Sequence, residues 1–252
     1  MSQPRTILST QNLVKEFQGF RAVDGVDLNV REGTVHALVG PNGAGKTTLF
    51  HLLTGFLSAS AGRIALGGQD ITGRPPERIA RLGIARSFQV TSLFADVTAC
   101  AHVELALQAA TGLGRSFWRS DQHMRRFTSR AMELLDQVGL AEHATRSAGS
   151  LPYGRKRALE LALALALDPK VLLLDEPTAG MGLEDVDRTV ALIGRVREGR
   201  TVVMVEHNMN VVGSLADTVT VLQHGQVLAE GPYRDVRSDP KVIEAYLGVD
   251  VA

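Results

Sequence analysis

The sequence predicts an α/β fold built around a mainly parallel sheet, with antiparallel strands near the N-terminus and a helical insertion. Short buried strands at residues 171–174, 201–205 and 218–222 alternate with helical stretches, which is the pattern of a parallel sheet covered by helices. Residues 7–30 carry an apolar residue at every second or third position, which is typical of antiparallel strands. Between residues 96 and 146 strand signals vanish, and apolar residues recur at helical spacing.

Composition restricts the class of protein. The 252 residues are 44% hydrophobic, 21% charged and 5% aromatic, as in ordinary globular proteins. Lys plus Arg equals Asp plus Glu at 27 each, so the net charge gives no reason to expect nucleic acid or an anionic lipid surface as the main partner. The single cysteine, Cys100, cannot form an internal disulfide, and a reducing cytosol fits this cysteine usage.

The sequence contains no candidate for a membrane-spanning helix, which requires roughly 18 consecutive apolar residues. The most apolar stretch, residues 161–167, is much too short and is followed by Asp168 and Pro169. The N-terminus has no basic segment followed by an apolar one, so we expect no signal peptide. If the protein acts at a membrane, another protein must dock it there.

A glycine-rich loop separates a predicted strand at residues 34–39 from a helical pattern at residues 48–53. The loop matches G-x-x-x-x-G-K-[ST] and reads Gly40-Pro41-Asn42-Gly43-Ala44-Gly45-Lys46-Thr47. In this context its backbone N–H groups would surround phosphate oxygens, Lys46 would reach the β- and γ-phosphates, and Thr47 would hold Mg²⁺. A glycine turn with a capping lysine is the alternative. The motif by itself does not distinguish kinases, GTPases and ATPases.

Two acidic residues follow the strand at residues 171–174. The carboxyl end of a parallel strand is where α/β sheets place their ligands. Asp175 fits an indirect contact with Mg²⁺, and Glu176 can orient or deprotonate a water molecule that attacks the γ-phosphate. An acidic pair in this position can also be a helix cap or a solvated turn. The phosphate loop favours the catalytic interpretation.

A histidine follows the strand at residues 201–205. His207 could hydrogen-bond the γ-phosphate or the attacking water and so sense whether the phosphate is still attached. A histidine at a strand end can also be structural, and its place after the preceding motifs is what favours the catalytic role. We therefore predict Lys46, Glu176 and His207 as catalytic residues.

In their order along the chain, these motifs resemble those of ATP-binding-cassette (ABC) ATPases over nearly the whole length. Gln89 matches the family glutamine that links magnesium to the helical subdomain and the membrane subunits. Residues 151–155 occupy the place of the family signature, which begins a helix and caps the ATP of the partner subunit. Phe17 lies where an aromatic residue stacks on adenine, and Val23 where a small apolar residue supports that site.

The resemblance implies a P-loop NTPase (RecA-like) core with an antiparallel β subdomain and an inserted helical subdomain, which is the ABC ATPase architecture. Residues 1–252 would form a single ABC ATPase domain. Its nucleotide-binding core would comprise residues 1–94 and 160–230, its helical signature subdomain residues 95–159, and its C-terminal helical tail residues 231–252.

The resemblance also implies ATP and Mg²⁺ as cofactors and a head-to-tail dimer in which one subunit's signature covers the other's ATP. The implied nucleotide contacts are Phe17, Val23, Gly40, Pro41, Asn42, Gly43, Ala44, Gly45, Lys46, Thr47, Thr48 and Gln89. The implied signature residues across the dimer are Leu151, Pro152, Tyr153, Gly154 and Arg155. The implied metal contacts are Thr47, Gln89 and Asp175.

Two positions depart from the family pattern. Pro152 replaces the usual signature serine, a ligand of the γ-phosphate, and offers neither a hydroxyl nor a backbone N–H. Gly182 stands where the family commonly has Asp or Asn, so a hydrogen bond across the dimer is missing. Because Lys46, Asp175, Glu176 and His207 are all present, we still expect ATP hydrolysis, while the sequence leaves open how these two departures affect its rate.

The Tyr153-Gly154 signature, the long insertion after Gln89 and the ending at residues 242–248 resemble ATPases of importers for branched-chain amino acids and related solutes such as urea or amides. This resemblance implies integral-membrane permease subunits, a second ATP-binding subunit and a solute-binding protein as partners. It also implies a cytoplasmic location, peripheral on the inner face of the cell membrane. The ending can alternatively be a plain amphipathic helix.

The competing function is a soluble cassette ATPase that acts on nucleic acid or ribosomes. A single cassette, neutral net charge and the lack of sustained heptads argue against it, and we expect no nucleic-acid partner. A cluster of arginines could support that function, but a solvated helical face explains it as well. The cluster comprises Arg115, Arg119, Arg125, Arg126 and Arg130. A small-molecule kinase would require an acceptor-binding lid, and the sequence gives no reason to prefer one.

Overall fold

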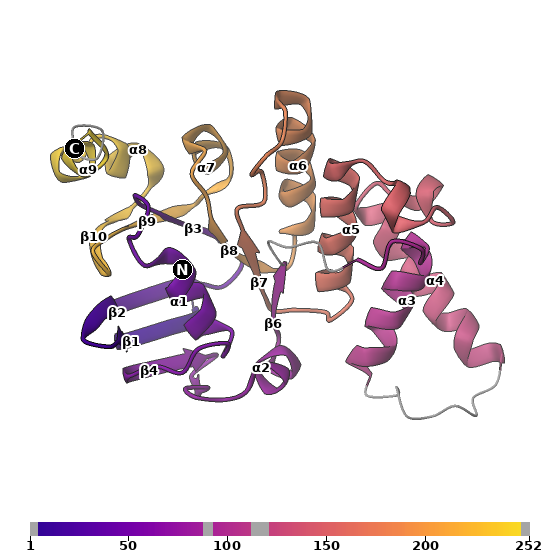
Figure 1. Cartoon of the computed structure of the whole chain (residues 1–252), viewed down its shortest axis with the longest axis horizontal. Helices are drawn as coiled ribbons and strands as arrows, with labels where there is room; N and C mark the ends of the chain where they lie inside the picture. Colours follow the sequence, from indigo (N-terminus) through magenta and orange to yellow (C-terminus); the bar gives the residue numbers. More distant parts are fainter. Residues whose placement is uncertain (1–4, 88–92, 112–120, 248–252) are drawn as a thin grey trace.

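A computed structural model describes residues 5–87, 93–111 and 121–247. Within these residues the larger sheet has the strand order β10-β9-β3-β8-β7-β6 and lies at the centre of the molecule (Figure 1). Its strands are β3 (Val35–Val39), β6 (Ile84–Ser87), β7 (Val171–Asp175), β8 (Thr201–Val205), β9 (Thr218–Gln223) and β10 (Gln226–Gly231). Strands β9, β3, β8, β7 and β6 run parallel, and β10 pairs with β9 in the antiparallel direction.

The parallel strands form because their sequences are almost continuously apolar. Every residue of β3, β7 and β8 is buried, as expected for strands that helices cover on both faces. The predicted strands at residues 171–174, 201–205 and 218–222 are confirmed as β7, β8 and β9. Strand β6, with the sequence Ile-Ala-Arg-Ser, was not predicted, because it is short and interrupted by an arginine.

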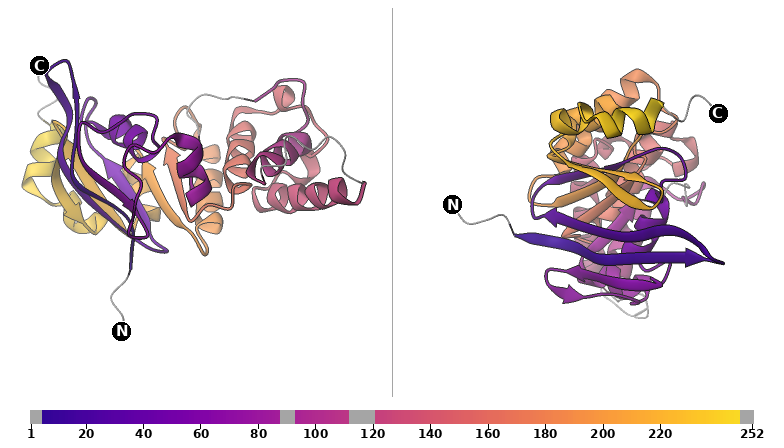
Figure 2. Two further views of the ribbon diagram at one scale, coloured as in Figure 1. Left: turned by 90° about the horizontal axis from the view of Figure 1, so that it is seen from below. Right: turned by 90° about the vertical axis from the view of Figure 1, so that its left-hand side faces the viewer.

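A smaller antiparallel sheet packs beside the larger one, with the order β2-β1-β4-β5 (Figure 2). Its strands are β1 (Thr6–Phe17), β2 (Phe20–Arg31), β4 (Ala61–Leu66) and β5 (Gln69–Asp70). Leu13 pairs with Val26, and both side chains are buried. The prediction of antiparallel strands at residues 7–30 is thus confirmed.

Two apolar clusters lie on opposite faces of the larger sheet. Because side chains alternate along a strand, Leu172 and Leu174 of β7 belong to one cluster, and Val171 and Leu173 belong to the other. The first cluster includes residues of α5 (Tyr153–Leu165), α6 (Leu183–Val196) and α7 (Met209–Leu215). The second includes residues of α1 (Lys46–Leu53), α2 (Pro76–Leu82) and the smaller sheet.

The predicted helical insertion forms one end of the molecule, at the right in Figure 1. Its helices are α3 (Ala99–Ala110) and α4 (Asp121–Gln137), which contact each other and α5. Single 3-10 turns follow at Ala141–His143 and Ala148–Ser150. The proposed domain limit after residue 159 falls inside α5, so this helix belongs to both the insertion and the core.

The described part of the tail contains two short helices at the opposite end of the molecule, beside β10 (Figure 1). These are α8 (Tyr233–Arg237) and α9 (Pro240–Leu247). Among the helices that the structure describes, none combines the length and the apolar character needed to span a lipid bilayer.

Candidate functional site

The glycine-rich loop connects β3 to α1 and packs tightly against neighbouring backbone. Gly40 has φ 146° and Gly45 has φ 100°, conformations that residues with a side chain rarely adopt. A Cβ atom at Gly40 would lie 2.1 Å from the carbonyl oxygen of Leu222, and one at Gly45 would lie 2.3 Å from that of Ala22. These two glycines are therefore required by close packing as well as by the turn.

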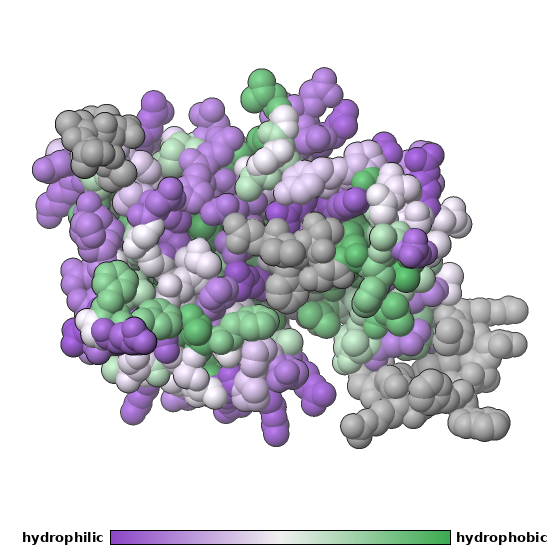
Figure 3. Space-filling model, in the orientation of Figure 1, coloured by the Kyte–Doolittle hydropathy of each residue, from purple (hydrophilic) through white to green (hydrophobic). Residues whose placement is uncertain are grey.

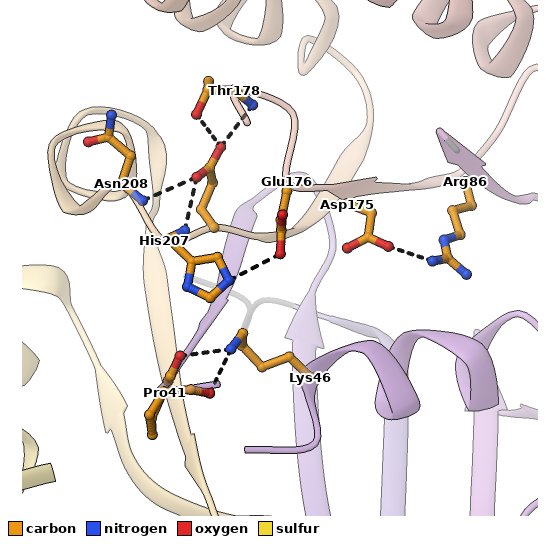
Figure 4. Close-up of polar contacts among 10 residues, drawn as sticks. Pro41, Lys46, Arg86, Asp175, Glu176, Thr178, His207 and Asn208 are labelled. Carbon is orange, nitrogen blue, oxygen red and sulfur yellow. Dashed lines mark hydrogen bonds and ion pairs between the residues drawn. The ribbon is translucent and has the colours of Figure 1, made fainter. Parts of the chain in front are cut away.

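Lys46 opens α1 and folds back over its own loop. Its ammonium group donates hydrogen bonds to the carbonyl oxygens of Gly40 at 2.7 Å and Pro41 at 2.9 Å, as Figure 4 shows. Burial lowers the pKa of Lys46, and the nearby carboxylates of Glu176 and Asp175 oppose that shift. The buried cation thus faces both acidic residues that the sequence selects.

Asp175, at the end of β7, is 2% exposed and forms an ion pair with Arg86 of β6. The arginine compensates for the removal of this carboxylate from water. Asp175 Oδ1 is buried and, within the described part of the chain, has no hydrogen-bond partner. An unsatisfied carboxylate oxygen beside the phosphate loop fits the predicted contact with a hydrated Mg²⁺, with the exposed Thr47 on α1 as the hydroxyl ligand.

Glu176 follows Asp175 with a left-handed backbone, φ 46°. Its N–H donates to the carbonyl oxygen of Val205 at 2.9 Å, which places the residue directly beside the end of β8. Glu176 Oε1 lies 3.1 Å from Nε2 of the exposed His207 (Figure 4). A carboxylate and an imidazole in hydrogen-bond contact, facing Lys46, can accept and hold the proton of an attacking water.

The structure thus brings together Lys46, Asp175, Glu176 and His207 at the carboxyl ends of β3, β7 and β8 (Figure 4). Sequence reasoning did not select two charged residues of this region. No sequence pattern points to Arg86, because only the pairing of β6 with β7 places it beside Asp175. Glu206 is buried next to His207 at the end of β8. In the sequence, only its position directly before His207 could have pointed to a role in the site.

The residues predicted to contact adenine lie on the β1–β2 hairpin. Phe17 is 42% exposed, with the Lys15 ammonium 4.9 Å from its ring centroid, whereas Val23 is buried. Phe17 ends β1 and the exposed Phe20 begins β2. Figure 3 shows apolar side chains gathered over the smaller sheet. An accessible ring suits stacking on a base, and the adenine contact stays a prediction. Gln89 lies outside the described residues.

The predicted signature begins α5, with Pro152 as the N-cap and without a side-chain cap. Tyr153 donates a hydrogen bond to the carbonyl oxygen of Ala179 at 3.3 Å, in the loop that follows Glu176. Helices α5 and α1 are well separated in Figure 1 and in the left view of Figure 2. A single chain therefore does not bring its signature to its own phosphate loop.

Comparison with known proteins identifies the family. The ABC transporter family profile matches residues 23–179, and a profile described as branched-chain amino acid ATP-binding cassette transporter matches residues 226–252. BraF of Pseudomonas aeruginosa, a high-affinity branched-chain amino acid transport ATP-binding protein, is 41% identical over 98% of this chain and 99% of its own. LivG of Escherichia coli, which bears the same description, is 38% identical over 98% of this chain and 99% of its own.

Solved structures give the same result. The ADP conformation of MJ1267, an ATP-binding cassette of an ABC transporter, has a TM-score of 0.84 and 31% identity and covers 97% of this chain and 99% of that one. A nucleotide-free ATP-binding cassette from an ABC transporter has a TM-score of 0.83 and 31% identity, with coverage of 96% and 99%. The chain belongs to the ABC transporter family, as an ATP-binding and ATP-hydrolysing cassette.

Proposed function

We propose that this cassette binds MgATP at a dimer interface and that its ATP hydrolysis drives the import of branched-chain amino acids through separate membrane subunits. The cluster of Lys46, Asp175, Glu176 and His207 supports the hydrolytic part of this proposal. The relatives BraF and LivG, and the profile match over residues 226–252, support the choice of solute.

In the proposed reaction, water attacks the γ-phosphorus of ATP, the bond to the ADP oxygen breaks, and ADP and inorganic phosphate leave. Glu176 accepts the proton of the attacking water, and His207 holds the Glu176 carboxylate and contacts the γ-phosphate. Lys46 exchanges its two loop carbonyls for phosphate oxygens. Mg²⁺, bound by Thr47 and through water by Asp175, would neutralise charge on the phosphates.

The separation of α1 and α5 supports a head-to-tail dimer. In such a dimer, the signature of one subunit would cover the nucleotide on the phosphate loop of the other, so ATP would join the subunits and hydrolysis would release them. The partner cassette would be a second copy or a paralogue. The dimer would dock on the cytoplasmic face of integral-membrane permease subunits, and a solute-binding protein would deliver the amino acid.

The alternative function in nucleic-acid or ribosome biology has weaker support. Arg115 and Arg119 lie outside the described residues. Arg130 forms an ion pair with Glu133 at 2.6 Å, as expected for a solvated helix face. The matched relatives are transport ATP-binding proteins.

The decisive experiment is an uptake assay. The complete transporter is isolated through this cassette in mild detergent with Mg²⁺ and ATP and is then placed in membrane vesicles. Radiolabelled leucine should accumulate with the unaltered cassette and not with Glu176→Gln, which keeps the shape of the side chain but cannot accept a proton. The variant should still bind ATP and should trap the closed dimer, because binding and hydrolysis use different groups.

The outcome against the proposal is equally clear. ATP turnover by Glu176→Gln at the unaltered rate would remove Glu176 from the chemistry. Copurification of ribosomal or nucleic-acid-associated proteins without membrane subunits would refute the transport function. Identification of the companions by mass spectrometry separates these two failures.

A further inference from the structure

Glu206 is a buried carboxylate that the proposed reaction does not use. It is the residue after β8 and is 3% exposed. Carboxylates are rarely this buried unless they are fully paired, because removal of the charge from water is costly. No cation partners Glu206 among the ion pairs of the described residues. Its compensation must therefore come from hydrogen bonds.

Those hydrogen bonds come from two loops. Oε1 accepts the Thr178 N–H at 3.0 Å and the Thr178 hydroxyl at 2.6 Å. Oε2 accepts the N–H of His207 at 3.0 Å and that of Asn208 at 3.2 Å (Figure 4). Each carboxylate oxygen thus accepts two donors. Only an acceptor with two equivalent oxygens satisfies this arrangement, since an amide would place an NH₂ group against N–H donors.

The two loops are those that carry the proposed catalytic pair. Thr178 lies two residues after Glu176, and His207 directly follows Glu206. The pairing of β7 with β8 ends at Asp175 and Val205. Beyond this point, sheet hydrogen bonds no longer hold the two following loops side by side. Past the paired residues, the Glu176 N–H still donates to the carbonyl oxygen of Val205, and the Glu176 carbonyl oxygen accepts from the Ala179 N–H within its own loop. The Glu206 carboxylate supplies the link between the loops that the sheet has ceased to provide.

We propose that Glu206 is a positioning residue for ATP hydrolysis, whose buried carboxylate clamps the loops after β7 and β8 and so holds Glu176 against His207. The role rests on the proposed function of these two residues. Glu206 itself contacts neither ATP nor water in this scheme. It acts through the 3.1 Å contact between Glu176 and His207, which sets where the proton acceptor lies.

The test is Glu206→Gln in the full chain, with kcat and KM for ATP measured separately. One of the two donor pairs then faces an NH₂ group, so the loops separate while the phosphate loop is untouched. We expect kcat to fall by about tenfold or more, within the range that a positioned general base contributes, and KM to change less than about twofold. Unchanged kcat, or a loss confined to KM, would overturn the proposal.

A second comparison distinguishes positioning from general stability. In a His207→Ala background, Glu206→Gln should have little further effect on kcat, because residues that act as a unit are not additive. An equal loss in both backgrounds would refute the clamp. Thr98→Ala, which removes the N-cap of the distant helix α3, should lower the unfolding temperature and leave kcat unchanged.

Two further measurements keep the proposal decidable. If Glu206→Gln does not fold, Thr178→Val removes only the hydroxyl bond, and a smaller fall in kcat that disappears in the His207→Ala background is the expected result. A fall that persists there rejects the clamp. ATP hydrolysis by the unaltered chain is measured first, since its absence would reject the proposed function, whereas normal hydrolysis with an unaffected Glu206→Gln rejects the clamp alone.

Discussion

At the scale of single residues, Glu176 occupies a backbone conformation that carries a cost. Non-glycine residues with a left-handed φ such as 46° are uncommon, and the conformation costs on the order of 1 kcal/mol or more. It persists because the Glu176 N–H bonds to Val205 and because Glu206 anchors Thr178 two residues later. The strained turn directs the side chain away from the sheet and toward His207 and Lys46 (Figure 4). Local strain at this point is therefore part of how the site is built.

The burial of His36 has a testable effect on how stability depends on pH. It lies in β3 at 1% exposure, and its Nε2 is 2.7 Å from the Thr220 hydroxyl, which donates to Glu230 at 2.6 Å. The hydroxyl proton is thus committed to Glu230, so His36 Nε2 carries the donor hydrogen. Burial, with a smaller effect from Arg31, lowers the pKa of His36 to about 4 from 6.5. The folded protein keeps this imidazole neutral.

The unfolded chain accepts a proton at His36 below about pH 6.5, whereas the folded protein does not until about pH 4, so acid favours unfolding within this window. Within this window we expect His36 to lower the free energy of unfolding by about 1.4 kcal/mol for each pH unit of acidification. Above about pH 6.5 we expect no effect of His36 on the free energy of unfolding. Urea unfolding of His36→Gln between pH 7 and pH 5 should show a shallower decline than that of the unaltered protein. Equal slopes for the two proteins would contradict this account.

The residues that the sequence could identify are those whose motif encodes their own backbone setting. Lys46 and Glu176 follow strands and turns that are visible in the sequence, so their placement needs no long-range information. Arg86 reaches Asp175 across 89 positions of sequence, and Glu206 reaches Thr178 across 28. These contacts depend on which strands become neighbours, and that order arises from packing of the whole sheet.

At the scale of elements, helix α9 connects the tail to the phosphate loop. Val242 and Ala245 are buried against the core, and Lys241, Glu244 and Ala245 line a cavity of about 540 Å³ together with residues 41–44 of the loop. Burial raises the pKa of Tyr246, and the nearby backbone of Gly40 partly opposes that effect. The last described helix thus lies against the first residue of the phosphate loop.

Removal of this contact should affect nucleotide binding. Tyr246→Phe removes the hydroxyl beside the backbone of Gly40 and keeps the ring, so we expect KM for ATP to rise by about threefold, the effect of one weak polar contact, with kcat unchanged. Ile243→Ala, on the exposed side of α9, serves as the matched control and should leave both constants unchanged. Equal KM values for the two variants would mean that α9 only packs against the core.

The elements that the sequence predicted are the strongly patterned ones. Strands β7 and β8 are apolar except for Asp175 and Thr201 at one end of each, and their predicted positions match the structure to within one residue. Strand β4 begins with Ala61 and Gly62 and contains Arg63, so its alternation is weak, and α2 spans only Pro76–Leu82. Strand β4 and helix α2 form because neighbouring strands and the second apolar cluster cover them. These tertiary contacts cannot be predicted from the local sequence.

At the scale of the whole molecule, the chain carries two separated segments that we propose as the halves of one composite site. The phosphate loop, Asp175, Glu176 and His207 lie at the sheet, and the signature lies at the start of α5 on the other side of β6 and β7 (Figure 1). Tyr153 of the signature nevertheless bonds to Ala179, three residues after Glu176. Within one chain, the segment proposed to cover a partner's ATP is therefore connected to the loop that carries its own proposed catalytic carboxylate.

We expect Pro152 to set how strongly these halves close on a partner. It caps α5 with φ −57° and ψ 158°, an extended conformation that serine adopts readily, and the helix has no side-chain cap. Pro152→Ser would supply a hydroxyl to the helix start and, in the proposed dimer, to the γ-phosphate of the partner's ATP. In a Glu176→Gln background, which prevents turnover, we expect sedimentation velocity to show dimer at several-fold lower ATP concentration. Pro152→Ala removes the ring without adding a hydroxyl and should not shift that concentration, so an equal shift with Ala would assign the effect to lost proline stiffness rather than to the hydroxyl.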